Sequence, residues 1–318
     1  MGLLRSGIGM SVVVLCGGVG AARFLEGLVR VVEPAQITAI VNVGDDEVFY
    51  GLHVSPDLDT VMYTLAGCVD AARGWGVRED TYRGQEMLRR YGRQGWFALG
   101  DADLATHILR TERLAAGSPL SMVTRELAQA LGVEVALLPA TDDRFATEVR
   151  TDAGWLRFQD YFVRRRATDP VREVRWVGAA QPAPGVLAAL AGARAVVLAP
   201  SNPIVSIGPI LALPGIREAL AATRATVIAV SPIVAGEALK GPAAAMLRTL
   251  GHECSAVGVA RLYADLLDTL VLDEQDAALA PEIAALGIRP VVTATVMRDL
   301  AAKEALARVT LGAADGVG

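Results

Sequence analysis

The sequence has few residues of several chemically informative kinds. Of its 30 basic residues only two, Lys240 and Lys303, are lysines, and it contains three cysteines and three histidines in 318 residues. Cys16, Cys68 and Cys254 lack metal-ligand spacing and form no paired framework, which excludes a disulfide-rich secreted fold and favours a cytoplasmic protein. The net charge of −5 offers no electrostatic basis for nucleic-acid binding.

A membrane-spanning segment is not expected either. The stretch 195–216 carries no charge and is long enough to span a bilayer, but four prolines interrupt it, which predicts a strand, a loop and a further element. The first residues show no signal-peptide cleavage pattern. We expect an N-terminal extension at 1–10, followed by a single α/β domain over 11–318.

What the sequence does have is 53% hydrophobic residues, arranged as β-branched runs that alternate with helical patterns. This alternation predicts an α/β fold with a doubly wound, Rossmann-like and mostly parallel sheet, and a mainly helical insertion or cap at about 58–132. The predicted strands are 11–16, 37–41, 133–139, 195–200, 226–230, 253–255, 270–272 and 291–293, with a hairpin at 148–158. The predicted helices are 21–32, 58–66, 82–91, 103–117, 120–131, 182–190, 242–250, 258–266 and 297–309.

A glycine-rich turn follows the first predicted strand. Gly17, Gly18 and Gly20 lie between that strand and a helix, an arrangement in which backbone amides and the helix dipole bind phosphate. The dinucleotide fingerprint is incomplete, because Arg23 stands where its third glycine is expected. A tight structural turn is nearly as good an interpretation of the glycines, and a solvent-exposed position is the simpler one for Arg23.

Four aspartates within fifteen residues are the most distinctive chemical feature. Asp45 and Asp46 follow the strand at 37–41, at the sheet edge where ligands of α/β proteins bind. Asp57 is predicted to be a helix N-cap, with Asp59 in the first turn. The four carboxylates would repel one another unless a cation lay between them, and their oxygens suit Mg²⁺. The alternative is that each is an ordinary turn or capping residue.

Two further segments carry candidate ligand contacts. Trp96 and Phe97 lie beside a polar loop and either stack on a planar ligand or belong to the core. His107 lies on a predicted helix, where a structural role is the simpler interpretation. The polar loop after the strand at 195–200 offers neutral hydrogen-bond donors to phosphate or to a base. Its candidate residues are Ser201, Asn202 and Ser206.

Several motifs, in one order over about 11–310, resemble the 2-phospho-L-lactate transferase family of coenzyme F420 biosynthesis. They are GGVGAARF at 17–24, NVGDD at 42–46, PDLDT at 56–60, LGD at 99–101, ATH at 105–107, APSNP at 199–203, SIGPIL at 206–211 and SPI at 231–233. The GVGAAR run is similar to the bacterial branch, in which the donor is thought to carry phosphoenolpyruvate.

The resemblance implies a transferase with Mg²⁺ as its cofactor. The donor would be a phosphoenolpyruvyl or 2-phospho-L-lactyl group linked to guanosine diphosphate, and the acceptor would be the deazaflavin Fo. A hydroxyl of the ribityl chain of Fo would attack the donor phosphorus, releasing GMP and giving F420-0 or its dehydro form. We also expect a homodimer, because the apolar content leaves room for an interface.

The resemblance also implies roles for particular residues. Asp59 and Asp45 would be catalytic, with orientation of the acceptor hydroxyl as the preferred role of Asp59. The metal would be held by Asp45, Asp46, Asp57 and Asp59. Fo would contact Asp59, Trp96, Phe97, Ala98, Asp101 and His107. The nucleotide and its diphosphate would contact Gly17, Gly18, Gly20, Arg23, Ser201, Asn202 and Ser206.

Two other functions remain as alternatives. One is a non-catalytic regulator of the related gluconeogenesis-factor family, which shares the glycine loop and binds nucleotide sugars. The run at 56–60 and the loop at 201–203 argue against it by resemblance. The other is a nicotinamide-dependent dehydrogenase, which the missing third glycine argues against.

Overall fold

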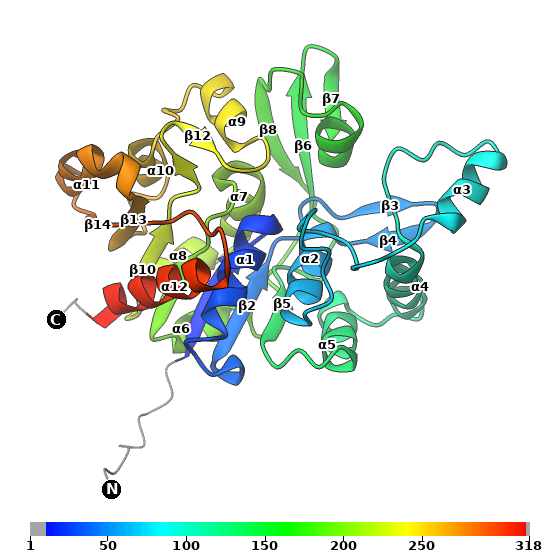
Figure 1. The fold of residues 1–318 in the computed structure, drawn as a ribbon, viewed down its shortest axis with the longest axis horizontal. Helices are drawn as coiled ribbons and strands as arrows, with labels where there is room; N and C mark the ends of the chain where they lie inside the picture. Colours follow the sequence, from blue (N-terminus) through cyan, green and yellow to red (C-terminus); the bar gives the residue numbers. More distant parts are fainter. Residues whose placement is uncertain (1–10, 316–318) are drawn as a thin grey trace, which may run out of the picture.

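A seven-stranded parallel sheet forms the centre of the computed structural model, which describes residues 11–315. The predicted extension at 1–10 lies outside the described residues. The strand order is β14-β13-β10-β9-β1-β2-β5, so the predicted doubly wound α/β class is confirmed (Figure 1). The strands are β1 (Val12–Cys16), β2 (Ile37–Val41), β5 (Ala136–Pro139), β9 (Ala195–Leu198), β10 (Thr226–Val230), β13 (Thr269–Asp273) and β14 (Arg289–Thr293).

Helices cover both faces of the sheet, so its strands are apolar throughout. Side chains of successive strand residues point to opposite faces, and accordingly Val12 and Val14 belong to one hydrophobic core, whereas Val13 and Leu15 belong to the other. The first core is completed by α1 (Gly18–Leu28), α2 (Pro56–Leu65), α5 (Leu120–Ala130) and α12 (Leu300–Asp315). The second is completed by α6 (Val186–Gly192), α7 (Gly208–Leu211), α8 (Ile216–Ala222), α9 (Ala243–Thr249), α10 (Ala256–Leu262) and α11 (Ala280–Ala285).

The chain reverses its direction across the sheet at β1. From β1 it moves outward through β2 to β5, and it then returns to place β9 on the other side of β1 before continuing through β10, β13 and β14. The strands β1 and β9 are neighbours, and the loops that follow them therefore lead away from each other at this edge of the sheet. In open α/β sheets such a switch point leaves a crevice in which ligands bind.

Smaller elements project from the central sheet (Figure 1). They are the hairpin β3 (Glu47–Phe49) and β4 (Leu52–Val54), the helices α3 (Arg83–Arg90) and α4 (Asp101–Ala115), and the antiparallel sheet β7-β6-β8, formed by β6 (Ala146–Thr151), β7 (Gly154–Arg157) and β8 (Glu173–Val177). A short hairpin follows β10, with β11 (Ile233–Val234) and β12 (Glu237–Ala238). The segment predicted to be mainly helical, about 58–132, contains α3, α4, α5 and most of α2.

Three local predictions were wrong. The segment 253–255 is not a strand, because it forms the short turn before α10. The helix predicted at 182–190 begins only at Val186, after Gly185 in the left-handed region. Asp57 is not an N-cap, because Ser55 takes that position and Pro56 begins α2, which moves Asp57 into the first turn. The hairpin β3–β4 was missed, since its strands are too short to show alternation.

The uncharged stretch 195–216 divides as predicted into β9, a π-helical turn (Pro203–Ile207) and α7. Within residues 11–315, no single helix has the length and apolar character needed to cross a membrane. The pair Pro203–Leu211 and Ile216–Ala222 passes that test only as two helices bent by 83°.

Candidate functional site

A cavity of about 660 Å³ opens at the switch point of the sheet. Its wall combines the turn after β1, the first two turns of α2 and the loop after β9. The segment after β10, the segment after β14 and the loop before α4 also line it, as do parts of the segments 73–76, 158–163 and 239–243. The structure thus brings together loops that are more than 200 residues apart in the sequence.

The glycine turn is built by close packing. A Cβ added to Gly17 would lie 2.3 Å from Oδ2 of Asp57, and one added to Gly20 would lie 2.2 Å from the carbonyl oxygen of Pro200. The Ser201 hydroxyl donates to the carbonyl oxygen of Gly17 at 2.9 Å and accepts from its amide at 3.3 Å. The glycines therefore let an acid and a second loop approach the end of β1, which supports the structural interpretation of this turn.

Asp57 lies at the amino end of α1, where the sequence had suggested a phosphate. The amide of Gly18 donates to the Asp57 carboxylate, so this acid already interacts with the positive end of the α1 dipole. A bound phosphate would need the remaining amides of the turn, or a cation shared with Asp57.

Asn42, the residue directly after β2, joins two of the predicted acids. Its amide nitrogen donates to Oδ1 of Asp45 at 3.0 Å and to Oδ2 of Asp57 at 2.9 Å. Its side-chain oxygen accepts from the amide of Gly44 at 2.8 Å, which fixes the turn that carries Asp45. Gln159 also donates to Asp45, to the carbonyl oxygen at 3.1 Å. One neutral amide therefore holds two buried carboxylates side by side.

These two acids lack a positive partner among the described residues. Burial, together with the charges of Asp57 and Asp46, raises the pKa of Asp45 well above its usual value. Burial also raises the pKa of Asp57 to about 7, with the charge of Asp46 adding to the effect and the bonds from Asn42 and Gly18 opposing it. A divalent cation between Asp45 and Asp57 would remove this repulsion, so the pair fits Mg²⁺.

Asp59 has a different environment, although only two residues separate it from Asp57. The guanidinium of Arg110 on α4 binds it with both terminal nitrogens, one of them 3.0 Å from Oδ2, and both side chains are buried. His107 lies between two acids, with Nδ1 3.7 Å from Asp59 and Nε2 3.2 Å from Asp103. Tyr63 donates to Asp103 at 2.8 Å.

The group of Asp59, Asp103 and His107 could itself offer three metal ligands, since their ligand atoms lie within 4.8 Å of one another. The Arg110 guanidinium already neutralises Asp59, however, and a cation added there would face that buried positive charge. The pair Asp45 and Asp57 is the better metal site by charge.

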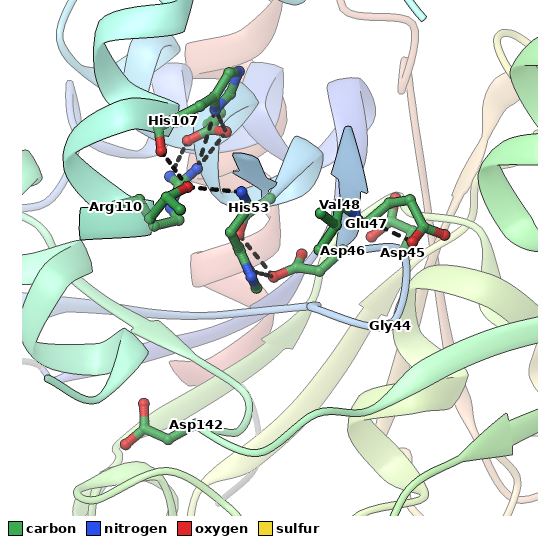
Figure 2. A network of polar contacts seen from close by, with 12 residues as sticks. Gly44, Asp45, Asp46, Glu47, Val48, His53, His107, Arg110 and Asp142 are labelled. Atoms are coloured by element: carbon green, nitrogen blue, oxygen red, sulfur yellow. Dashed lines mark hydrogen bonds and ion pairs between the residues drawn. The ribbon is translucent and has the colours of Figure 1, made fainter. Parts of the chain in front are cut away.

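Asp46 is close enough to Asp45 and Asp57 for its charge to raise the pKa of both, but its Oδ2 is bound elsewhere. Figure 2 shows its carboxylate turned toward His53 on β4, with Asp45 on the other side of the turn. Oδ2 lies 3.0 Å from Nε2 of His53 and accepts from Ser55 at 2.7 Å. Asp46 is not among the residues that line the cavity. Its Oδ2 therefore helps to fix the β3–β4 hairpin, whereas its Oδ1 is buried without a hydrogen-bond partner among residues 11–315. The assignment of Asp46 to the metal stays a prediction.

The residues predicted to contact the planar acceptor are also divided. Trp96, Phe97, Ala98 and His107 line the cavity, whereas Asp101 does not. The Asp101 carboxylate accepts from the amides of Arg83 and Gly84 at 3.0 and 2.9 Å, so it holds the start of α3.

The remaining residues predicted to contact the nucleotide lie in the cavity wall, and some of their hydrogen-bonding groups already have partners within the protein. Asn202 accepts from the amide of Ile204 at 2.9 Å and caps the following turn. Ser201, Asn202, Ser206 and Arg23 all line the cavity, together with the three glycines.

Sequence reasoning missed several residues of this site. Asn42 stood inside a recognised motif, and its position at a strand end was a usable signal. Arg110 and Asp103 offered no such signal in the sequence, because a charged residue on an amphipathic helix ordinarily faces solvent. Lys240 was noted only for the rarity of lysine, yet it lines the cavity.

Comparison with known proteins gives one family and close relatives. The family described as 2-phospho-L-lactate transferase CofD matches residues 12–304. A protein named phosphoenolpyruvate transferase from Streptomyces griseus is 46% identical over 97% of this chain and 99% of its own length. A protein named 2-phospho-L-lactate transferase from Methanothermobacter thermautotrophicus is 40% identical over 95% of this chain and 97% of its own length.

A solved structure of a UPF0052-family protein from Bacillus halodurans shares the fold. It superimposes with a TM-score of 0.63 at 18% identity, and the match covers 96% of this chain and all of that one. At this identity the likeness supports the α/β architecture alone.

Proposed function

Since the chain belongs to the 2-phospho-L-lactate transferase CofD family, we propose that it transfers a phospho-acid group to the ribityl hydroxyl of Fo. The donor in this proposal is the phosphoenolpyruvyl or 2-phospho-L-lactyl group linked to guanosine diphosphate, and GMP is the leaving product. The relatives' names support both phospho-acids. The observation that carries the proposal is the buried pair Asp45 and Asp57, without a cationic partner among residues 11–315, at the switch point of the sheet.

Mg²⁺ would be held by Asp45 and Asp57, which Asn42 keeps adjacent. The fit rests on charge and donor type: two oxygen ligands with raised pKa values and room in the cavity for phosphate oxygens. The ion would neutralise charge that develops as the bond to GMP breaks, which transfers of this kind need more than covalent catalysis. We leave Asp46 out of this ligand set because it does not line the cavity and its Oδ2 is bound by His53 and Ser55.

Asp59 would orient the acceptor hydroxyl. Both of its oxygens are bound by Arg110, so its direction is fixed, which suits a hydrogen-bond acceptor better than a general base. His107 and Asp103 extend the same polar wall and offer further contacts to a polyhydroxyl chain.

The ring system of Fo would lie along the aromatic wall of the cavity. Phe97 stacks on Phe49 with ring centres 4.1 Å apart, and Trp96 meets the same ring edge-on at 5.2 Å. Phe162 stacks on Phe158 at 5.5 Å, and both line the cavity. These pre-packed rings offer flat apolar surface at low entropic cost.

The test is turnover. Purified protein, Fo, Mg²⁺ and each guanylylated phospho-acid in turn are combined, and GMP and the Fo product are followed by mass spectrometry. We expect one GMP per molecule of product and a clear preference for one phospho-acid. Absence of GMP with every donor would contradict the proposal. Tight binding of a nucleotide sugar without turnover would instead favour the regulator.

Mg²⁺ should stabilise the protein more strongly at higher pH. Because the pKa of Asp57 is about 7 when folded and ~3.9 when unfolded, the folded state retains a proton that the unfolded chain has lost. Without metal, the free energy of unfolding should therefore fall as pH rises from about 4 to about 7. Mg²⁺ binds the ionised acids, so the increase in melting temperature that it causes should be larger at pH ~8 than at pH ~6.

Differential scanning calorimetry at both pH values, with Mg²⁺ and with EDTA, measures this difference. The control is Asp45→Asn, in which the increase caused by Mg²⁺ should be much smaller at either pH. An increase of the same size at both values in the unaltered protein would contradict the assignment of Asp57 to the metal.

A further inference from the structure

Two basic side chains lie in the cavity without acidic partners. Arg23, on α1, and Lys240, after β12, both line the cavity. Within residues 11–315 neither forms an ion pair, whereas nearly all the other cavity charges are acids or, like Arg73, are already paired. Lys303, the other lysine, is paired with Glu26 at 2.5 Å. Lys240 is exposed and Arg23 is partly buried, so both side chains are accessible to a ligand that enters the cavity.

Lys240 is held toward α1 by the backbone of the loop that carries Trp75. Its ammonium donates to the carbonyl oxygen of Arg73 at 3.1 Å. A Cβ added to Gly74 would lie 3.4 Å from that ammonium and 2.7 Å from Val19 in the first turn of α1. The ammonium therefore lies beside the amino end of α1. Burial and the charge of Arg23 both lower the pKa of Lys240, as expected for two neighbouring cations.

Arg73 is close to this pair but is satisfied by other contacts. Its guanidinium lies 3.5 Å from Asp70, and the guanidinium carbon lies over the rings of Trp75 and Tyr82, at 5.5 and 5.2 Å from their centres. Its role here is to present a carbonyl oxygen that positions Lys240. The unpaired charge at this end of the cavity is thus that of Arg23 and Lys240.

The cavity consequently has an acidic side, with Asp45 and Asp57, and a basic side, with Arg23 and Lys240, and the amino end of α1 lies between them. The resemblance already implies that Arg23 contacts the donor diphosphate; we propose that Lys240 binds the same diphosphate beside it. This inference rests on the proposed function and assigns Lys240 to substrate binding. Two cations and the free amides of a helix start match a multiply charged anion. A neutral guanine base or the Fo ring would leave both cations unpaired.

The experiment measures binding of GDP, GMP and guanosine by isothermal titration calorimetry at constant Mg²⁺, with intact protein. In Lys240→Gln, we expect the affinity for GDP to fall roughly 10- to 100-fold, as for loss of a charge-assisted bond. The affinity for GMP should fall less, and that for guanosine should not change. Lys240→Arg should retain most of the GDP affinity. Lys303→Gln, the matched control, should bind all three as the unaltered protein does.

Arg23→Gln and the double variant test whether the two cations share one group. If they do, the loss in the double variant should differ from the product of the two single losses. Unchanged GDP affinity in Lys240→Gln, or an equal loss for guanosine, would overturn the inference. Melting temperatures within a few degrees of that of the unaltered protein would exclude misfolding as the cause.

The binding experiment and the turnover experiment can fail independently of each other. If GMP is released in turnover but Lys240→Gln binds GDP normally, the transferase proposal stands and the diphosphate site is wrong. If no donor is turned over but Lys240→Gln still loses GDP affinity, the diphosphate site stands and the proposed reaction is wrong.

Discussion

Asp45→Asn should abolish most activity and yet stabilise the metal-free protein. Turnover should fall by at least about 10²-fold, since a positioned catalytic group contributes about that much or more. The melting temperature with EDTA at pH ~8 should rise, by the equivalent of about 0.5–2 kcal/mol. The reason is that Asp45 is buried beside Asp57 without a cation, so its charge is unfavourable in the folded state. Asparagine keeps the shape and removes that charge.

Asp142→Asn is the matched control. Asp142 does not line the cavity and lies apart from Asp45 in Figure 2. Its carboxylate accepts from the amide and hydroxyl of Ser121 at 2.6 and 2.8 Å, at the start of α5. Its replacement should leave turnover unchanged and should not raise the melting temperature, because that carboxylate is satisfied. Full activity in Asp45→Asn would remove Asp45 from the site. A lower melting temperature would contradict the electrostatic account.

Asp59→Ala should cost both activity and stability. The role that the resemblance implies for Asp59 predicts that turnover falls well over tenfold, by ~10²–10⁴-fold, with the fold intact. The structure changes the second expectation, because removing Asp59 leaves the buried guanidinium of Arg110 without its partner. Breaking a buried pair in this way typically costs 3–5 kcal/mol, about a third or more of a domain's stability. Urea denaturation and turnover measure the two effects.

The double variant Asp59→Ala/Arg110→Met separates them. Removing both charges should restore most of the free energy of unfolding, since a buried ion pair can often be replaced by apolar groups at little cost. Turnover should stay low, because the carboxylate that orients the acceptor is still missing. If the double variant recovered turnover as well as stability, the only role of Asp59 would be to stabilise the fold.

The sequence by itself determined the architecture. Alternating β-branched runs and helical patterns fixed the strands of a parallel sheet, because strands buried on both faces must be apolar along their whole length, as β1 and β9 are. It also located the chemistry: Asp45 and Ser201 follow closely on strand ends, and such ends meet at one edge of a parallel sheet. Short elements such as β3 and β4 were missed, since three residues show no period.

Only the tertiary structure decided what each acid does. Asp45 and Asp46 are adjacent in sequence, but Asn42 turns one toward Asp57, while His53 and Ser55 hold the other apart. Asp57 and Asp59 share one helical turn, yet Arg110 neutralises only Asp59. The function of a carboxylate depends on which charges lie within a few ångströms of it, and those partners come from segments distant in the chain. Periodicity predicts which face of an element is buried; it does not predict which buried groups meet.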